Sequence, residues 1–164
     1  MTDAPSPIRP TDDDARTLAR SLIDSARHGA LAFRHPETGL PAASRIAVAR
    51  DAEGAPLTLI SSLALHSRAL RAEPRAALLL GEPGARGDPL THPRLSLDIA
   101  AAFVERDTED HATLRSHYLR QQPKAKLYVD FGDFAFVRLV PTGAALNGGF
   151  GRAFVLTAED LRRR

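Results

Sequence analysis

Residues 95–103 constrain the fold more than any other segment, because their side chains alternate in character along the chain. A period of two residues is typical of a β-strand with one face against a core. The alternation therefore predicts a sheet wrapped around a core. One face carries Leu95, Leu97, Ile99, Ala101 and Phe103, and the other carries Ser96, Asp98, Ala100 and Ala102.

Further strand-like runs follow one another along most of the chain, separated by Gly, Pro and Asp residues of the kind that tight turns require. Apolar residues recur at helical spacing most clearly after Thr11. Thr11 is placed to cap this helix, and Gly29 ends it. Because most strands are consecutive, a mainly β (α+β) antiparallel barrel is favoured over a parallel sheet. We expect strands at residues 30–34, 44–50, 57–60, 75–81 and 95–103, a strand pair from 134 to 146, and helices at 11–26, 69–72, 108–121 and 124–129.

The chain has 164 residues, 43% of them hydrophobic, which fits one domain with a core. We expect a flexible lead-in over residues 1–10 and a single domain over residues 11–164. The sequence has no apolar run of about 18 residues and no signal-peptide pattern, so the expected location is cytoplasmic, away from the membrane. The net charge of +2 does not indicate a nucleic-acid partner.

Several classes of chemistry are excluded. The absence of cysteine removes disulfides, thiolate catalysis, iron–sulfur clusters and cysteine-bound zinc. The motifs of serine hydrolases, P-loop nucleotidases and zinc proteases are also absent. The six histidines lack the spacing of metal ligands, so no metal site is predicted, and only His66 has neighbours that suggest a binding role.

Residues 61–70 form the clearest candidate binding segment. They join a strand-like run to a helix-like run through Ser61, Ser62, His66, Ser67 and Arg68. The N–H groups at a helix start, the helix dipole and these side chains can converge on a phosphate. An ordinary Ser-rich turn that caps a helix accounts for the same residues. The pattern alone leaves both interpretations open.

A series of short motifs, in order from residue 11 to residue 156, gives the chain a family resemblance. The motifs are Ala30-Leu31-Ala32, Ser44-Arg45, Ser61-Ser62-Leu63, His66-Ser67-Arg68-Ala69-Leu70, Gly87-Asp88-Pro89-Leu90, Pro93-Arg94-Leu95, Tyr128-Val129-Asp130-Phe131-Gly132-Asp133-Phe134 and Gly148-Gly149-Phe150-Gly151-Arg152-Ala153. The set resembles the pyridoxamine 5′-phosphate oxidase-like family of FMN-binding split barrels. Within that family it is most similar to the branch related to haem-utilisation proteins.

The resemblance implies a six-stranded antiparallel split β-barrel with flanking helices. It also implies a homodimer that holds FMN in two clefts at the subunit interface. The flavin would be lined by Ser44 and Arg45, and the phosphate and ribityl end would be held by Ser61, Ser62, Ser67 and Arg68. Ile46, Leu63 and His66 are further candidate cofactor-binding residues.

Other motifs have two interpretations each. Residues 148–152 either approach the cofactor, since glycine permits close contact, or form a plain turn after the last strand. Asp88 and Arg94 are both candidates for a position near the ligand. Alternatively, Asp88 caps a turn. Aromatic stacking on the cofactor is limited to Phe150, Tyr128 and apolar neighbours.

The function implied by the resemblance is that of an FMN-dependent oxidoreductase with an unknown small-molecule substrate, because flavin supplies the redox chemistry and the protein supplies placement. Alternatively, the cleft binds haem with His66 or His92 on the iron, or the chain is a non-catalytic flavin-binding dimer. Members of the haem branch often have a further C-terminal domain. Residues 1–164 do not include one, so we expect any haem ligand from such a domain to be missing.

Overall fold

The computed structural model describes residues 7–163. The lead-in expected over residues 1–10 lies largely outside this part of the chain. Ile8–Arg9 form the short strand β1, which pairs in parallel with β9 (Ala153–Thr157). The first described residues are therefore joined to the last strand of the sheet.

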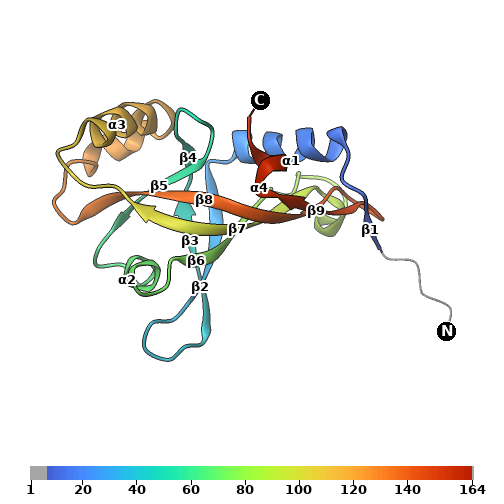
Figure 1. Ribbon diagram of the computed structural model, residues 1–164, viewed down its shortest axis with the longest axis horizontal. Coiled ribbons are helices and arrows are strands. Elements are labelled where there is room, and N and C mark those ends of the chain that lie inside the picture. Colours follow the sequence, from blue (N-terminus) through green and yellow to red (C-terminus); the bar gives the residue numbers. More distant parts are fainter. Residues whose placement is uncertain (1–6, 164) are drawn as a thin grey trace.

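One nine-stranded sheet forms the body of the protein, in the order β1-β9-β8-β7-β6-β2-β3, with β5 beside β8 (Figure 1). Apart from β1 with β9, the neighbouring strands are antiparallel. The barrel itself consists of β2 (His28–Arg34), β3 (Pro41–Ala47), β5 (Pro56–Ser61), β6 (Arg75–Leu80), β7 (Arg94–Phe103) and β8 (Phe134–Asn147).

The barrel is split between β3 and β5. After β3 the chain continues into the short strand β4 (Ala49–Arg50), which pairs with β5 only through Ala49 with Leu57 and Arg50 with Pro56. Within residues 7–163, no ladder joins β3 itself to β5. The prediction of a six-stranded antiparallel split barrel with flanking helices is confirmed.

Side-chain alternation places the barrel core as the sequence predicts. In β7, Leu95 and Leu97 are completely buried, whereas Asp98 is exposed. Gly29 on β2 also faces inward, where a Cβ would lie 2.8 Å from Leu80 Cδ2. A larger residue would force the two strands apart, so the absence of a side chain at Gly29 allows their close packing.

The strand pair expected over residues 134–146 is instead one long strand, β8, which runs through Pro141. A bulge in β8 makes this possible, because Ile99 pairs with Pro141 and Asp98 with Gly143, which leaves Thr142 as an extra residue. Proline donates no ladder hydrogen bond and is tolerated at such a bulge. The partner strand follows as β9, after a turn.

Helices flank the barrel, and their bounds differ somewhat from the sequence prediction (Figure 1). The first helix is capped by Asp12 rather than Thr11. The helix expected at residues 69–72 begins four residues earlier, at Leu65. The segment expected at residues 124–129 forms a 3₁₀ helix. None of the described helices has the length and apolar character needed to cross a membrane. They are α1 (Asp13–Ser25), α2 (Leu65–Ala72), η1 (Pro89–Thr91), α3 (Glu109–Gln121), η2 (Pro123–Leu127) and α4 (Ala158–Leu161).

Two groups of buried apolar side chains stabilise this arrangement. The larger group fills the barrel and includes the inner side of α1. The second, which we call the α3 core, lies between α3, η2 and the strands β4, β5 and β8. It consists of Ala49, Leu57, Leu59, Leu114, Tyr118, Ala125, Val129 and Phe136.

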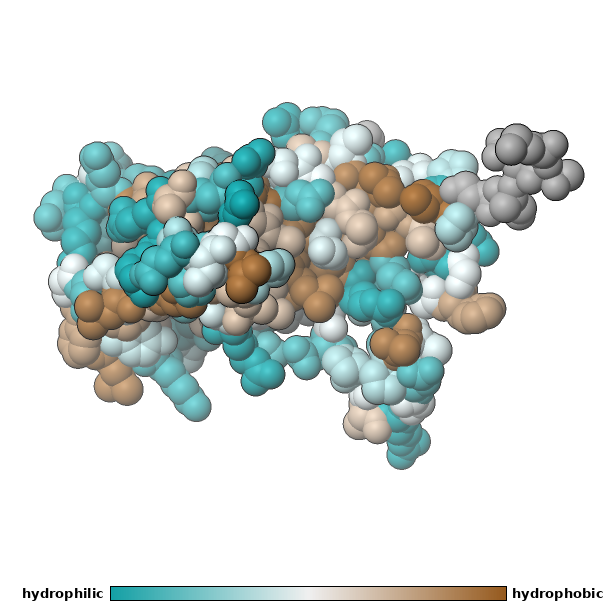
Figure 2. All heavy atoms as spheres, turned by 90° about the horizontal axis from the view of Figure 1, so that it is seen from below, coloured by the Kyte–Doolittle hydropathy of each residue, from teal (hydrophilic) through white to brown (hydrophobic). Residues whose placement is uncertain are grey.

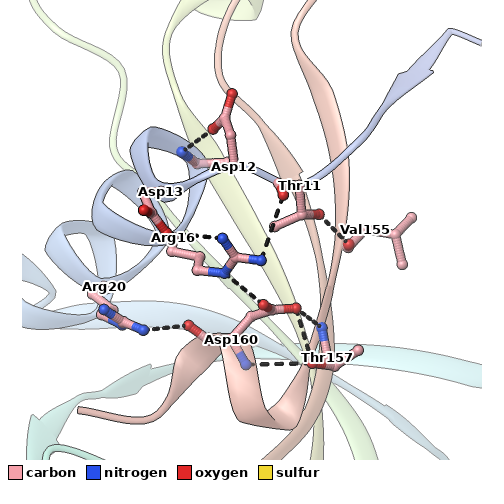
Figure 3. Close-up of polar contacts among 9 residues, drawn as sticks. Thr11, Asp12, Asp13, Arg16, Arg20, Val155, Thr157 and Asp160 are labelled. Atoms are coloured by element: carbon pink, nitrogen blue, oxygen red, sulfur yellow. Dashed lines mark hydrogen bonds and ion pairs between the residues drawn. The ribbon is translucent and has the colours of Figure 1, made fainter. Parts of the chain in front are cut away.

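Asp160 links the two ends of the described chain (Figure 3). Its carboxylate accepts hydrogen bonds from Arg16 Nε of α1 at 2.7 Å and from the Thr157 N–H at 2.8 Å. The Thr157 hydroxyl in turn caps α4 in a capping box. The Asp160 carbonyl accepts a further bond from Arg20 at 2.9 Å. These contacts hold α1 against α4 and β9.

We expect Asp160→Ala to lower the free energy of unfolding by about 1–2 kcal/mol at neutral pH. The Thr157 N–H and Arg16 lower the pKa of Asp160 to about 2 from its ordinary value of 3.8. Stability from this depressed pKa is fully present above about pH 4 and is lost as the pH falls toward 2. The difference between wild type and variant, measured by urea unfolding, should therefore narrow between pH 4 and pH 2.

Asp14→Ala is a matched control, because Asp14 is an exposed carboxylate on the same helix α1. We expect a change of a few tenths of a kcal/mol at most. Equal losses for the two variants would contradict the role of Asp160 as a link.

Candidate functional site

A cleft of about 310 Å³ lies where the barrel splits, and we call it the β3–β5 cleft. Strand β3 contributes one wall, β5 the opposite wall, and the start of α2 closes one end. Residues after η2 and at the start of β8 complete it. The lining residues are Arg45, Ile46, Ala47, Leu59, Ile60, Ser61, Ala64, His66, Tyr128 and Phe134.

His66 contributes an imidazole to the cleft. Its ring is half-buried and lies edge-on to Phe33, with ring centroids 6.4 Å apart. No hydrogen bond to the ring nitrogens is found within residues 7–163, and burial lowers the pKa of the imidazole below its usual 6.5. The ring is therefore neutral at pH 7, with a nitrogen free to bind a metal ion or accept a proton.

The start of α2 beside His66 lacks a side-chain cap. The N-cap residue is Ala64, which makes no side-chain hydrogen bond, so the Ser-rich turn does not cap this helix. Ser61 is used elsewhere: its hydroxyl donates to Asp133 Oδ2 at 2.5 Å and accepts from the Leu63 N–H at 3.1 Å. The positive end of α2 is left open toward the cleft, which favours an anionic group there.

Arg45 adds a second source of positive charge at the mouth of the cleft. It is exposed on β3, and none of the ion pairs among the described residues involves it. Opposite this charge the cleft is apolar, with Ile46 and Ile60 on the strands and a Tyr128–Phe134 pair whose ring centroids are 5.0 Å apart. The cleft thus suits a flat apolar ligand with anionic groups at one edge.

No family model matches the chain, but comparisons with curated proteins and solved structures find several similar proteins. The haem oxygenase HutZ of Vibrio cholerae is 30% identical over 134 residues, which cover 75% of this chain and 70% of HutZ. The chain belongs to the haem-utilisation branch of the pyridoxamine 5′-phosphate oxidase-like family. The fold is also that of a pyridoxinephosphate oxidase family protein from Clostridium acetobutylicum, with a TM-score of 0.69, 11% identity, and coverage of 92% of this chain and 99% of that one.

Two longer members of the haem-utilisation branch are also similar. The non-canonical haem oxygenase HOZ of Arabidopsis thaliana is 34% identical over 141 residues, covering 85% of this chain but only 42% of HOZ. A haem-binding protein from Mycobacterium smegmatis has 33% identity and a TM-score of 0.81, covering 94% of this chain and 61% of that one. The chain therefore spans about half of the length of these two relatives.

The cleft brings together four of the residues predicted from the sequence, Arg45, Ile46, Ser61 and His66. The other predicted residues point elsewhere. Ser44 pairs with Leu31 and is not among the lining residues of the cleft, Leu63 is 83% exposed, and Ser67 is 1% exposed. Ser62 lines a separate cavity beside Arg71, and Arg68 forms an ion pair with Glu37 at 3.2 Å.

The loop before β7 holds its polar residues in internal contacts. Asp88 caps η1 by accepting from the Leu90 N–H at 2.9 Å, as one of the two interpretations predicted. His92 has both ring nitrogens occupied, by the Gly84 N–H at 3.1 Å and the Arg86 carbonyl at 2.9 Å. Of the two histidines considered for haem iron, only His66 has a free nitrogen in the cleft.

The turn between β8 and β9 is closed by its own backbone, since the Gly148 N–H donates to the Arg152 carbonyl at 2.7 Å. It lies at the opposite end of the molecule from α3 (Figure 1). Within one subunit it therefore does not contribute to the cleft. The lining residues that the sequence analysis did not assign to the cofactor are mainly apolar, Ala47, Leu59, Ile60, Ala64 and Phe134, and carry no motif signal of their own.

Proposed function

We propose that this protein binds haem in the β3–β5 cleft, with His66 as the iron ligand. The observation that carries the proposal is a half-buried, neutral imidazole with free nitrogens in a cleft next to an unpaired arginine. Relatives named as haem oxygenases or haem-binding proteins support the same ligand.

The residues of the cleft fit the chemistry of haem. Haem is a flat apolar ring with two carboxylates at one edge and an iron that accepts imidazole. Ile46, Ile60 and Phe134 would cover the ring and exclude water, while Arg45 and the open start of α2 would bind the carboxylates. His66 would orient the ring by binding its iron. The bound haem would supply redox and oxygen chemistry, as haem does in other proteins.

FMN is the second candidate ligand for the same cleft. The open N-terminus of α2 and Arg45 suit a phosphate, and Tyr128 and Phe134 suit the flavin ring. FMN contains no metal ion that the free nitrogen of His66 could bind, however, and this favours haem. An FMN-dependent oxidoreductase therefore stays the alternative.

The test is a titration of the purified protein with haemin and, separately, with FMN, followed by visible absorption. We expect a saturable Soret band with haemin at one haem per subunit and no saturable change with FMN. Saturable FMN binding without haemin binding would replace the proposal with its alternative. Absence of binding in both titrations would overturn the assignment of this cleft as a cofactor site.

We also propose that two copies of the chain meet on the outer face of the sheet. One row of paired, outward-facing residues runs across six strands of the sheet, from β9 to β3. In order, the row consists of Val155, Ala145, Ser96, Leu79, Ala30 and Arg45. Most of these are small or apolar, and Val155 is 58% and Leu79 45% exposed. Apolar and pale surface also crosses the side of the molecule seen in Figure 2. A second copy on this row would adjoin the cleft, because Arg45 belongs to both.

Val155→Asp should therefore shift the protein from dimer to monomer in sedimentation velocity at micromolar concentration, because a buried unpaired carboxylate is costly. Val140→Asp is the control, since Val140 is 41% exposed but lies outside the row. If the cofactor lies between subunits, the monomeric variant should also lose haemin. A monomer that keeps haemin would contradict a shared site.

A further inference from the structure

A second cavity of about 310 Å³ lies next to the β3–β5 cleft, and we call it the Arg71 cavity. It is bounded by the last turn of α2, the end of β7 and the start of β8. Phe134 lines both this cavity and the cleft, so the two share a wall. The residues that make the Arg71 cavity distinctive are two arginines and a serine, none of which lines the cleft.

Arg71 brings to this cavity a positive charge that no group of the protein neutralises. Its guanidinium carbon lies 3.9 Å from the centroid of the Phe103 ring, a cation–π contact that holds the group at the cavity wall. Within residues 7–163, Arg71 makes no hydrogen bond and no ion pair. Arg68, one turn earlier on α2, is instead paired with Glu37 at 3.2 Å. The N–H donors of Arg71 are therefore available to a ligand.

A second guanidinium group, that of Arg106, is held at the same cavity. Its Nη2 donates to the carbonyl of Phe134 at 3.1 Å and to that of Phe131. Both bonds use one nitrogen, so Nε and Nη1 keep their hydrogens for other acceptors. No carboxylate forms an ion pair with Arg106 in the part of the chain that the structure describes. Two positive charges without counter-ions thus line one cavity, and an anion between them is favoured.

Ser62 adds a hydroxyl to the lining. Its backbone N–H donates to the Asp133 carbonyl at 2.7 Å, which fixes the position of the residue. The hydroxyl itself has no partner among the described residues. A third donor is therefore free beside the two arginines.

Two carboxylates also belong to the lining, and neither neutralises the arginines. Asp133 is half-buried, and its Oδ2 accepts from the hydroxyl of Ser61 at 2.5 Å. Glu105 is exposed. Neither carboxylate lies within ion-pair distance of either arginine. An anion can therefore reach the guanidinium groups without breaking an ion pair of the protein.

This set of donors fits a phosphate group. A phosphate has several acceptor oxygens, and the planar guanidinium group binds two of them at once. Phe103, Val104 and Phe134 add apolar surface next to the donors. We propose that the Arg71 cavity binds a phosphate monoester, with the two guanidinium groups and the Ser62 hydroxyl on the phosphate and the ester group on the apolar side chains. The site lies outside the β3–β5 cleft and does not rest on haem binding.

Calorimetric titrations with phenyl phosphate and, separately, with inorganic phosphate test the proposal. We expect saturable binding of phenyl phosphate and weaker binding of inorganic phosphate, which makes no apolar contact. Arg71→Gln should lower the affinity for phenyl phosphate by about tenfold or more, as expected for a lost charge-assisted hydrogen bond. Arg120→Gln is the matched control, because Arg120 is an exposed arginine without an ion pair that does not line the cavity. It should bind like wild type.

Gly132 allows the charge of the cavity to be changed without disturbing packed atoms. A Cβ at this position would meet no atom within 4 Å. Gly132→Glu places a carboxylate at the cavity and should also lower the affinity for phenyl phosphate by about tenfold or more. Gly132→Gln adds a side chain of nearly the same size without the charge, and it should stay within about twofold of wild type.

Four results would overturn the proposal. The first is the absence of saturable phenyl phosphate binding by wild type. The second is a loss of affinity in Arg45→Gln but not in Arg71→Gln, because the anion would then lie in the β3–β5 cleft. The third is an equal loss in Gly132→Glu and Gly132→Gln, because space rather than charge would then decide binding. Equal affinities for the two phosphates would exclude a contact with the ester group.

The proposed haem function is tested separately by the haemin titration, whose outcome leaves these results unchanged.

Discussion

Replacing His66 by alanine is expected to lower the affinity for haemin by about tenfold or more and to change the position of the Soret band. The reason is that His66 supplies the only cleft imidazole among the described residues. Both quantities come from the same absorption titration. Added imidazole should restore much of the wild-type spectrum, because a small free ligand can enter the space that the side chain leaves.

The pH dependence of haemin binding gives an independent measurement. Haem iron binds only an unprotonated imidazole nitrogen. Burial lowers the pKa of His66 below 6.5. Affinity should therefore stay constant as the pH falls to about 6.5 and decrease only below the lowered pKa. His92→Ala and His117→Ala should behave like wild type in both tests, because neither residue lines the cleft. An unchanged spectrum in His66→Ala would remove this residue as the iron ligand.

The sequence predicted the barrel well because the alternation of side chains is a local signal. Residues 95–103 alternate over nearly the whole length of β7, and burial follows that alternation at Leu95, Leu97 and Ile99. Strand β9 was not predicted, because its five residues form a short segment whose pairing with β8 and β1 exists only in the completed fold. The course of β8 through Pro141 was similarly ambiguous, because the bulge beside this proline depends on how β8 pairs with β7.

The candidate site was predicted in part, because a motif names neighbours along the chain and the fold decides where each one points. His66, Ser67 and Arg68 are consecutive, and successive residues of a helix point about 100° apart. His66 consequently faces the cleft, Ser67 is buried, and Arg68 reaches Glu37. The same logic places Ser44 and Arg45 on opposite faces of β3.

Long-range contacts account for what the sequence could not predict about the site. The Ser61 hydroxyl is bound by Asp133, 72 residues further on, which removes it from any cap of α2. Tyr118 packs against Phe136 only because α3 lies across β5 and β8. No spacing along the chain indicates either contact, since both depend on the completed fold.

Phe136→Ala is expected to lower the free energy of unfolding by about 3–5 kcal/mol, because the ring is completely buried and its loss leaves a cavity. Phe136 lies on β8 opposite Leu59, and its ring contacts Tyr118 and His111, with centroids 5.5 and 5.2 Å away. It thus joins the sheet to α3. Urea unfolding of the cofactor-free protein measures the loss.

Phe150→Ala is the matched control, because it makes the same chemical change at a side chain that is 97% exposed, and it should cost less than about 0.5 kcal/mol. Phe136→Ala should also weaken haemin binding, since the cavity lies behind Leu59, which walls the cleft. Phe136→Leu refills most of the space and should recover much of both losses. If Phe136→Ala loses no more stability than Phe150→Ala, the α3 core does not support the cleft.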